Sequence, residues 1–323
     1  MNENCLLNIK NLSVEYTSSD RVIHAVNGVS LTLKEGETLG LVGETGAGKT
    51  TIAKSILQIL PDISSRISGG EIWFDGRNLL SLPEKEMLKV RGGQISMIFQ
   101  DPMTALNPLQ TVGEQISEGL MLHNDISEAE AHAKTVEMLQ MVGITEERYH
   151  DFPHQFSGGM KQRVVIAMAL ACSPRLLLAD EPTTALDVTI QAQILDLMRD
   201  LRNKMNSSMI LITHDLGVVA EMCDYVAIVY AGQIIEYGSK RQVFKHPTHP
   251  YTVGLFNALP SMTADEPRLH PIEGLPPDPA CLPDGCKFAP RCPYATDACR
   301  KGEIGTQETE QGHVTRCIRR EEV

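Results

Sequence analysis

The sequence has no long run of apolar residues. Its longest such stretch, Val164 to Cys172, is far shorter than the roughly 20 residues that a membrane-spanning helix needs. The first residues, Met1 to Asn4, also lack the basic patch and the apolar core of a secretion signal. We therefore expect a chain that neither crosses a membrane nor is exported, and that works in the cytoplasm.

Basic residues are also scarce. The 29 Lys and Arg are outnumbered by 41 Asp and Glu, for a formal net charge of −12. This charge disfavours the phosphate backbone of a nucleic acid as the main partner, so we expect no nucleic acid to be bound.

At 323 residues and 42% hydrophobic composition, the chain can form two domains, or one large domain with an appendage. For the eight cysteines, a cytoplasmic location favours free thiols or metal ligands over disulfides.

The most specific motif is a glycine-rich loop between a predicted strand and a predicted helix. It has the phosphate-binding pattern of Gly, four residues and Gly-Lys-Thr, and consists of Gly43, Glu44, Thr45, Gly46, Ala47, Gly48, Lys49 and Thr50. The apolar run 38–42 precedes it, and apolar residues at helical spacing follow it as far as Leu60, before Pro61. Backbone amides in such a loop wrap phosphates at a helix N-terminus, Lys49 reaches the outer phosphates, and Thr50 can bind magnesium. The motif predicts nucleotide binding.

Two carboxylates end a predicted buried strand at 175–181. Asp180 and Glu181 stand at its carboxyl end, which is where open α/β sheets bind ligands. One carboxylate can hold magnesium and the other can polarise an attacking water. Beside a phosphate loop, this pair predicts phosphoryl chemistry rather than a solvated strand end.

Other polar residues allow two interpretations each. Gln100 and His214 end predicted strands, either as ordinary polar tips or as contacts to the γ-phosphate and its water. Tyr16 is either a sheet aromatic or a platform for a nucleotide base. Ser157 either caps a helix or, with the amides of the following glycines, forms a second anion site. A helical pattern from 112 to 143 suggests a helical subdomain at about 102–165.

In their order and spacing, these residues closely resemble the ATP-binding subunit of an ABC transporter over about residues 5 to 240. The resemblance implies Walker A at Gly43–Thr50 with Thr51 beside it, and Walker B ending at Asp180 with Glu181 as the catalytic carboxylate. It also implies an adenine-stacking Tyr16, a Q-loop Gln100, a switch His214 and a D-loop Asp187, with magnesium held by Thr50, Gln100 and Asp180. The family signature falls on Ser157, Gly158, Gly159 and Met160. Met160 departs from the glutamine that is more usual at this position.

The resemblance further implies an α/β fold with a RecA-like core, an antiparallel β subdomain and a helical subdomain. Two ATPase subunits of this family pair head to tail, and each ATP lies between one subunit's Walker A and the other's signature. Two transmembrane permease subunits and, indirectly, an extracytoplasmic substrate-binding protein would complete the assembly. The chain would then sit peripherally on the cytoplasmic face of the cell membrane.

The carboxy-terminal part resembles the ATPases of oligopeptide and dipeptide importers, and the related nickel importers, at 246–252 and 259–260. We predict an ATP-binding domain at 1–258 and a C-terminal extension at 259–323. Six prolines between 260 and 279 predict an extended arm.

The extension carries a cluster of cysteines at Cys286, Cys292, Cys299 and Cys317, with Cys281 as a spare candidate. Their spacing lacks the close pairs of common zinc sites, and four thiolates can hold an iron–sulfur cluster instead. The family resemblance favours a 4Fe–4S cluster, with zinc as the alternative and free structural thiols as the plain interpretation. The remaining cysteines, Cys5, Cys172 and Cys223, are predicted to be packing residues.

The sequence therefore predicts an ATPase that uses ATP and magnesium to drive import of di- and oligopeptides. One alternative is an importer of nickel or another small solute. Another is a soluble ABC ATPase of DNA repair or translation, which the absence of a second cassette, a long coiled coil and a basic bias disfavours. A non-hydrolysing regulatory subunit is disfavoured by the presence of Lys49, Asp180 and Glu181.

Overall fold

The structure, a computed structural model, describes residues 5–18, 21–184, 186–258 and 271–322. These form two compact units. The first unit consists mainly of Leu33–Thr38 and Ser81–Thr213, and the second of Leu7–Thr32, Leu39–Leu80 and the chain from His214 onward. The predictions that concern residues 1–4, Ala185 and the first half of the proline-rich arm lie outside the described residues. The proposed boundary at residue 258 remains a prediction.

The first unit contains a buried parallel sheet of β6 (Ile95–Ile98), β7 (Leu176–Asp180) and β8 (Ser208–Ile212). Ile95 pairs with Leu176, and Leu176 pairs with Ser208. Every residue of the three strands is buried, as expected for a parallel sheet covered on both faces. All three strands were predicted from their apolar runs. Because the strands are parallel, the polar residues that follow β6 and β7 come out at the same edge.

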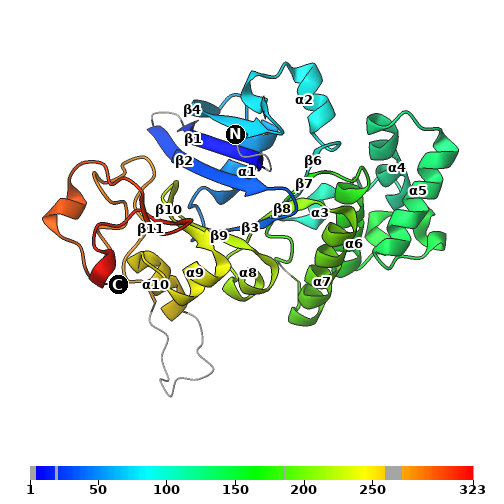
Figure 1. Ribbon diagram of the computed structural model, residues 1–323. Helices are drawn as coiled ribbons and strands as arrows, with labels where there is room; N and C mark the ends of the chain where they lie inside the picture. The colour runs from blue at the N-terminus through cyan, green and yellow to red at the C-terminus, as the bar shows by residue number, and fades with distance from the viewer. Residues whose placement is uncertain (1–4, 19–20, 185, 259–270, 323) are drawn as a thin grey trace. The chain divides into compact units, whose positions relative to one another are not determined.

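Helices make up most of the remaining first unit (Figure 1). They are α2 (Glu84–Val90), α3 (Pro102–Ala105), α4 (Val112–His123), α5 (Glu128–Met141), α6 (Gly158–Leu170) and α7 (Val188–Met205). Capping boxes begin α4 at Thr111 and α5 at Ser127, so the local sequence determines where both helices start. On α5, Ala131 and Leu139 are buried, whereas Val136 is only half-buried.

The second unit contains a four-stranded sheet in the order β2-β1-β4-β5. Its strands are β1 (Cys5–Ser18), β2 (Arg21–Lys34), β4 (Ser65–Phe74) and β5 (Arg77–Asn78). β4 pairs antiparallel with both β1 and β5, and the turn Asp75-Gly76 joins it to β5. The short apolar runs of the first 33 residues thus belong to two long strands.

The second unit also contains a run of neighbouring strands in the order β11-β12-β10-β9-β3. Its strands are β3 (Thr38–Val42), β9 (Tyr225–Tyr230), β10 (Gln233–Ser239), β11 (Gln307–Glu310) and β12 (His313–Thr315). β3 and β9 are parallel, whereas β10 pairs antiparallel with β9 and β12. The cysteine-bearing tail therefore contributes two strands to this run, which the sequence did not indicate.

The helices of the second unit are α1 (Lys49–Leu57), α8 (Leu216–Met222), α9 (Lys240–Lys245) and α10 (Pro250–Asn257). The prediction that α1 runs to Leu60 and is stopped by Pro61 was wrong. The helix ends at Leu57 because Gln58 adopts a left-handed conformation, from which its amide caps the carbonyls of Lys54 and Ser55.

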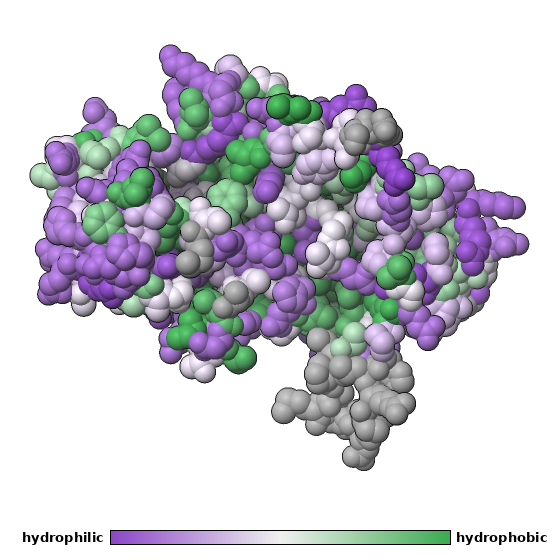
Figure 2. Space-filling model, turned by 180° about the vertical axis from the view of Figure 1, so that it is seen from behind, coloured by the Kyte–Doolittle hydropathy of each residue, from purple (hydrophilic) through white to green (hydrophobic). Residues whose placement is uncertain are grey.

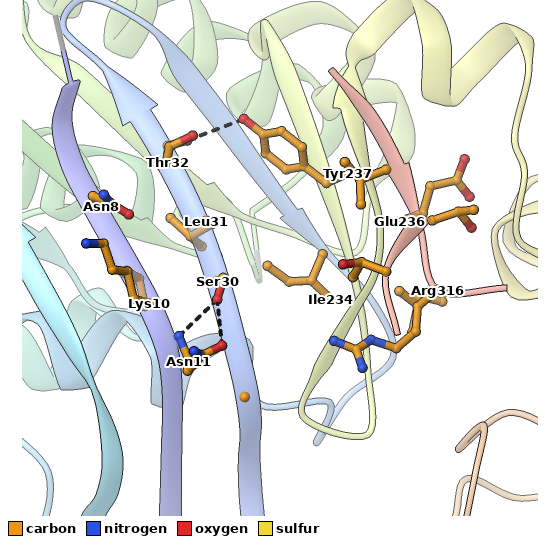
Figure 3. Close-up of a pocket in the computed structure, with 16 residues that line it drawn as sticks. Asn8, Lys10, Asn11, Ser30, Leu31, Thr32, Ile234, Glu236, Tyr237 and Arg316 are labelled. Carbon is orange, nitrogen blue, oxygen red and sulfur yellow. Dashed lines mark hydrogen bonds between the residues drawn. The ribbon is translucent and has the colours of Figure 1, made fainter. Parts of the chain in front are cut away.

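A groove of about 360 Å³ lies between β2 and β10 in the second unit. Figure 3 shows the two hydrogen-bonded pairs on its walls, Thr32 with Tyr237 and Asn11 with Ser30. On the molecular face drawn in Figure 2, apolar residues are dispersed among polar ones. None of the helices in the described ranges combines the length and apolar character required to cross a membrane.

Candidate active site

The glycines of the phosphate loop allow the backbone to pass close to neighbouring strands in the second unit. A Cβ on Gly43 would lie 2.1 Å from the Val229 carbonyl oxygen, and a Cβ on Gly48 would lie 2.4 Å from that of Ala25. Gly48 also has a φ of 102°, in the region that favours glycine. The loop therefore has its shape because these positions carry no side chain.

Lys49 stands at the centre of this loop and is only 6% exposed. Its Nζ donates hydrogen bonds to the carbonyl oxygens of Gly43 at 2.7 Å and Glu44 at 3.0 Å. Lys49 also begins α1, whose first turn has no acidic residue to oppose a bound anion. A positive side chain, loop amides and a helix N-terminus thus converge on one spot, which is the chemistry that a polyphosphate requires.

Tyr16 lies beside the start of the same helix. Its hydroxyl is 3.3 Å from the Thr51 Oγ1, at a part-buried position. Thr50 and Thr51 are the residues that follow Lys49 in α1, so the ring of Tyr16 is held near the phosphate loop within one unit.

The carboxylates after β7 form a second group, in the first unit. Asp180 is 3% exposed, at the end of the strand, and Glu181 follows it with a φ of 47°. The Glu181 amide donates to the Ile212 carbonyl of β8 at 2.9 Å, which fixes its backbone. Its carboxylate accepts hydrogen bonds of 2.9 Å from both the Gln100 side-chain amide and the Thr184 hydroxyl. Thr184 was not singled out from the sequence, although it lies only three residues after Glu181.

Ser157 is the N-cap residue of α6, but its side chain makes no capping hydrogen bond. Ser157 and Gly158 are exposed at the helix N-terminus. Gly159 packs closely, since a Cβ there would lie 2.7 Å from the Ile190 Cγ2. The hydroxyl and the first amides of α6 are thus presented outward, which favours the anion-site interpretation over simple capping.

Met160 has a local partner in the first unit. The Arg148 Nη1 lies 3.5 Å from the Met160 sulfur, and the Arg148 guanidinium stacks 4.1 Å from the centroid of the Phe156 ring. Arg148 also pairs with Asp151 at 2.8 Å. The thioether therefore packs into a fixed arginine–aromatic pair next to the signature residues.

The remaining predicted site residues fall in different units. Asp187, in the first unit, caps α7 by accepting from the Ile190 amide at 3.0 Å. His214 is exposed and belongs to the second unit, as do Tyr16 and the phosphate loop. Within the first unit the structure brings Gln100 to Glu181, and within the second it brings Tyr16 to Thr51.

The four predicted cysteine ligands line one small cavity of about 20 Å³ in the second unit, and Cys281 does not. Among the described residues, no three His, Cys, Asp or Glu side chains are already arranged as a metal site. Burial raises the pKa of the Cys286, Cys292 and Cys317 thiols, and proximity to the other thiols adds to the effect. For Cys317 the pKa rises to about 11. These three thiols would need a nearby cation if they are to ionise together.

Two nitrogen donors also border this cavity. The His249 Nδ1 accepts from the Tyr251 amide at 3.1 Å, and burial lowers the pKa of His249 to about 4, so the neutral ring carries its proton on Nε2. That Nε2 and the Nε of Arg316 are buried with no acceptor among the described residues. Sulfur acceptors in the cavity would satisfy both, so the donor set fits a sulfur-rich, negatively charged group.

Comparison with known proteins gives two family matches, one to the nucleotide-binding part of the chain and one to its C-terminal part. The family described as "ABC transporter" matches residues 26–184, and "Oligopeptide/dipeptide transporter, C-terminal region" matches residues 235–299. The oligopeptide transport ATP-binding protein OppD of Escherichia coli is 52% identical over 91% of this chain and 87% of its own length. The dipeptide transport ATP-binding protein DppD of Bacillus subtilis is 48% identical over 97% of this chain and 94% of its own.

Solved structures of ABC proteins also match this chain. A dimeric ATP-binding cassette in a post-hydrolysis state, bound to ADP and Pi, matches with a TM-score of 0.66 at 29% identity, over 73% of this chain and 99% of that one. The CbiO1 protein of Clostridium perfringens, part of an ABC transporter complex, matches with a TM-score of 0.65 at 30% identity, over 78% of this chain and 96% of that one.

Proposed function

The chain belongs to the ABC transporter family of ATPases, and from this membership we propose that it drives the import of di- and oligopeptides through a membrane-embedded partner. The main observation behind this proposal is that almost the whole chain matches ATP-binding proteins of dipeptide and oligopeptide transport, at about 50% sequence identity. The separate match of residues 235–299 to the C-terminal region of that transporter group supports the same substrate class.

ATP is held in this proposal by the second unit's loop. Loop amides and Lys49 bind the β- and γ-phosphates, and Tyr16 stacks on the adenine. The oxygens of Thr50, Gln100 and Asp180 suit magnesium, which prefers carboxylate, hydroxyl and amide oxygen ligands and neutralises charge on the phosphates.

Hydrolysis is assigned to the carboxylate after β7. Glu181 accepts a proton from, and orients, the water that attacks the γ-phosphate, while His214 contacts the γ-phosphate and the water. The hydrogen bonds from Gln100 and Thr184 to Glu181 support this role, because they hold the carboxylate in one orientation. Gln100 would report the state of the site to the membrane partner.

The site is completed by a second subunit. Ser157, Gly158, Gly159 and Met160 would close over ATP bound to a homologous ATPase subunit in a head-to-tail dimer, with Asp187 at the same interface. The exposed N-terminus of α6 supports this, because its amides are open to an anion from outside the chain. Two transmembrane permease subunits would place the ATPase pair on the cytoplasmic face of the membrane, below an extracytoplasmic substrate-binding protein.

The C-terminal cysteines would hold a 4Fe–4S cluster. Support comes from the convergence of Cys286, Cys292, Cys299 and Cys317 on one cavity, and from the buried donors of His249 and Arg316 beside it. When bound, such a group cross-links four points of the tail.

The proposal is tested by co-purification and transport. The full chain should co-purify with its permease subunits and with a second ATPase subunit, and deletion of its gene should abolish uptake of di- or oligopeptides. Restoration of uptake by the wild-type chain, and its absence with Lys49→Ala, would support the function. Loss of nickel uptake with normal peptide uptake would overturn the substrate class.

A further inference from the structure

Arg291 of the cysteine-bearing tail reaches the phosphate loop. It directly precedes Cys292, and its Nη1 donates to the Glu44 Oε2 at 2.9 Å. The Arg291 side chain is 6% exposed and that of Glu44 is 26% exposed, so the pair is partly shielded from solvent. Both residues belong to the second unit. An acidic residue of the loop is thus neutralised by a residue almost 250 positions later in the chain.

The guanidinium of Arg291 is held rigidly. Its Nε donates to the Glu273 carbonyl at 3.0 Å and its Nη2 to the Ile272 carbonyl at 3.3 Å. Its Nη1 also donates to the Tyr230 hydroxyl at 3.3 Å, and the guanidinium lies 5.9 Å from the centroids of the Tyr230 and Phe288 rings. Because the guanidinium is anchored on several sides, it sets the position of its partner rather than following it.

The backbone of Glu44 is fixed as well. Its amide donates to the Tyr251 hydroxyl at 3.0 Å, and its carbonyl accepts from the Lys49 Nζ at 3.0 Å. Tyr251 is fully buried and packs 4.6 Å from the Tyr230 ring. Glu44 therefore connects the tail's arginine to the lysine of the phosphate loop.

A cavity of about 290 Å³ borders the same part of the loop. It is lined by Glu44–Ala47, Tyr230, Ala231 and the described arm residues Pro276–Pro279. The arm is attached there, since the Pro279 carbonyl accepts from the His24 amide at 3.0 Å. The first half of the loop is thus enclosed by C-terminal residues.

We propose that Arg291 is a positioning residue for ATP binding, which neutralises and holds the Glu44 carboxylate beside Lys49 of the phosphate loop. The inference rests on the assignment of the loop 43–50 to ATP. Without Arg291, the Glu44 carboxylate would be an uncompensated negative charge on the loop that binds the anionic phosphates. If Arg291 has this role, the C-terminal segment is part of the nucleotide site even though it contributes no atom to the phosphate contacts.

The test is a double-mutant cycle on the full chain, with magnesium–ATP affinity measured by titration calorimetry. Arg291→Met retains the aliphatic packing but removes the charge, and we expect about a tenfold weaker affinity for ATP. Glu44→Gln added to Arg291→Met should recover most of that loss, because it removes the uncompensated charge. The loss should also shrink at high salt, which screens repulsion between partly exposed charges. A purely structural role of Arg291 predicts neither the recovery nor the salt effect.

Controls separate this inference from the function on which it rests. Lys301→Ala removes an exposed cation of the same segment and should leave ATP affinity unchanged. Lys49→Ala should abolish binding, and if it does not, the assignment of the loop itself fails. If Lys49→Ala abolishes binding while Arg291→Met binds ATP as the wild type does, only the role of Arg291 is refuted. Should Arg291→Met not fold, Arg291→Gln removes the charge but keeps a hydrogen-bond donor, and it should show the same roughly tenfold loss, recovered by Glu44→Gln. Unchanged affinity in Arg291→Gln would contradict the electrostatic argument.

Discussion

The side-chain amide of Gln100 donates a hydrogen bond to the Glu181 carboxylate across 2.9 Å. Gln100 follows β6 and Glu181 follows β7, which are neighbouring parallel strands of the first unit. A residue assigned to communication with the membrane partner thus holds the residue assigned to hydrolysis. Any movement of the segment after β6 would change the orientation of the carboxylate.

Replacing Glu181 with Gln should abolish ATP turnover while ATP binding is retained. The amide cannot accept a proton from the attacking water, whereas the phosphate loop is untouched, so we expect a rate loss of about 10²-fold or more. Turnover is measured by phosphate release in the assembled complex and binding by titration of ATP. Glu137→Gln, at an exposed position of α5, is the control and should behave as wild type. Normal hydrolysis by Glu181→Gln would remove the catalytic assignment.

Replacing Ser157 with Ala separates the anion-site interpretation from helix capping. Because the Ser157 hydroxyl makes no capping bond, we expect the free energy of unfolding to change by less than about 0.5 kcal/mol. Turnover in the assembled complex should fall about tenfold, because a donor to the phosphates bound by the partner is lost.

The matched variant for this test is Ser127→Ala. The Ser127 hydroxyl does accept from the Glu130 amide, at 3.3 Å, in the capping box of α5. We expect it to lose about 1 kcal/mol of stability, measured by urea unfolding, with turnover maintained. If Ser157→Ala shows the stability loss and normal turnover instead, Ser157 is only a cap.

Replacing Tyr16 with Ala should raise the KM for ATP about tenfold with little change in kcat. A stacked base is worth about 1–3 kcal/mol, and this interaction is made equally in the ground and transition states. Tyr16→Phe keeps the ring and removes only the hydroxyl near Thr51, so its KM should stay within about twofold of wild type. Equal defects in both variants would show that the contact to Thr51, and not stacking, is what matters.

Much of the site could be predicted because its residues carry local signals. The strands before Gly43, Gln100 and Glu181 are short apolar runs. The change from apolar to polar or glycine residues marks where each strand ends. The end of α1 was missed because a non-glycine residue, Gln58, adopts the left-handed conformation that stops the helix. Sequence patterns assign that conformation mainly to glycine and asparagine.

The contacts of the tail could not be predicted. Arg291 and Tyr251 reach Glu44 only because β10, β12 and α10 bring them there, and nothing within a few residues of either indicates a distant carboxylate or amide. Pairing between residues far apart in the sequence depends on topology, which a single sequence specifies only weakly. The same reason explains why His249, which lies in the family-like segment 246–252, was not recognised as a donor to the cysteine cavity.

Anaerobically purified protein should contain iron and acid-labile sulfide in equal amounts, about four of each per chain. Cys286→Ser should lose most of both and should unfold at a lower temperature, because a group bound only by the folded state stabilises it. Cys281→Ser is the matched control, since Cys281 is exposed and does not line the cavity. It should retain full iron and sulfide content and the wild-type melting temperature. Zinc alone in the wild-type protein would mean that the four thiols hold a single ion in the small cavity, and the cluster would be refuted. Full iron and sulfide content in Cys286→Ser would show that the cysteines lining the cavity are not the ligands, and equal loss from both variants would show that the cavity does not define the ligand set.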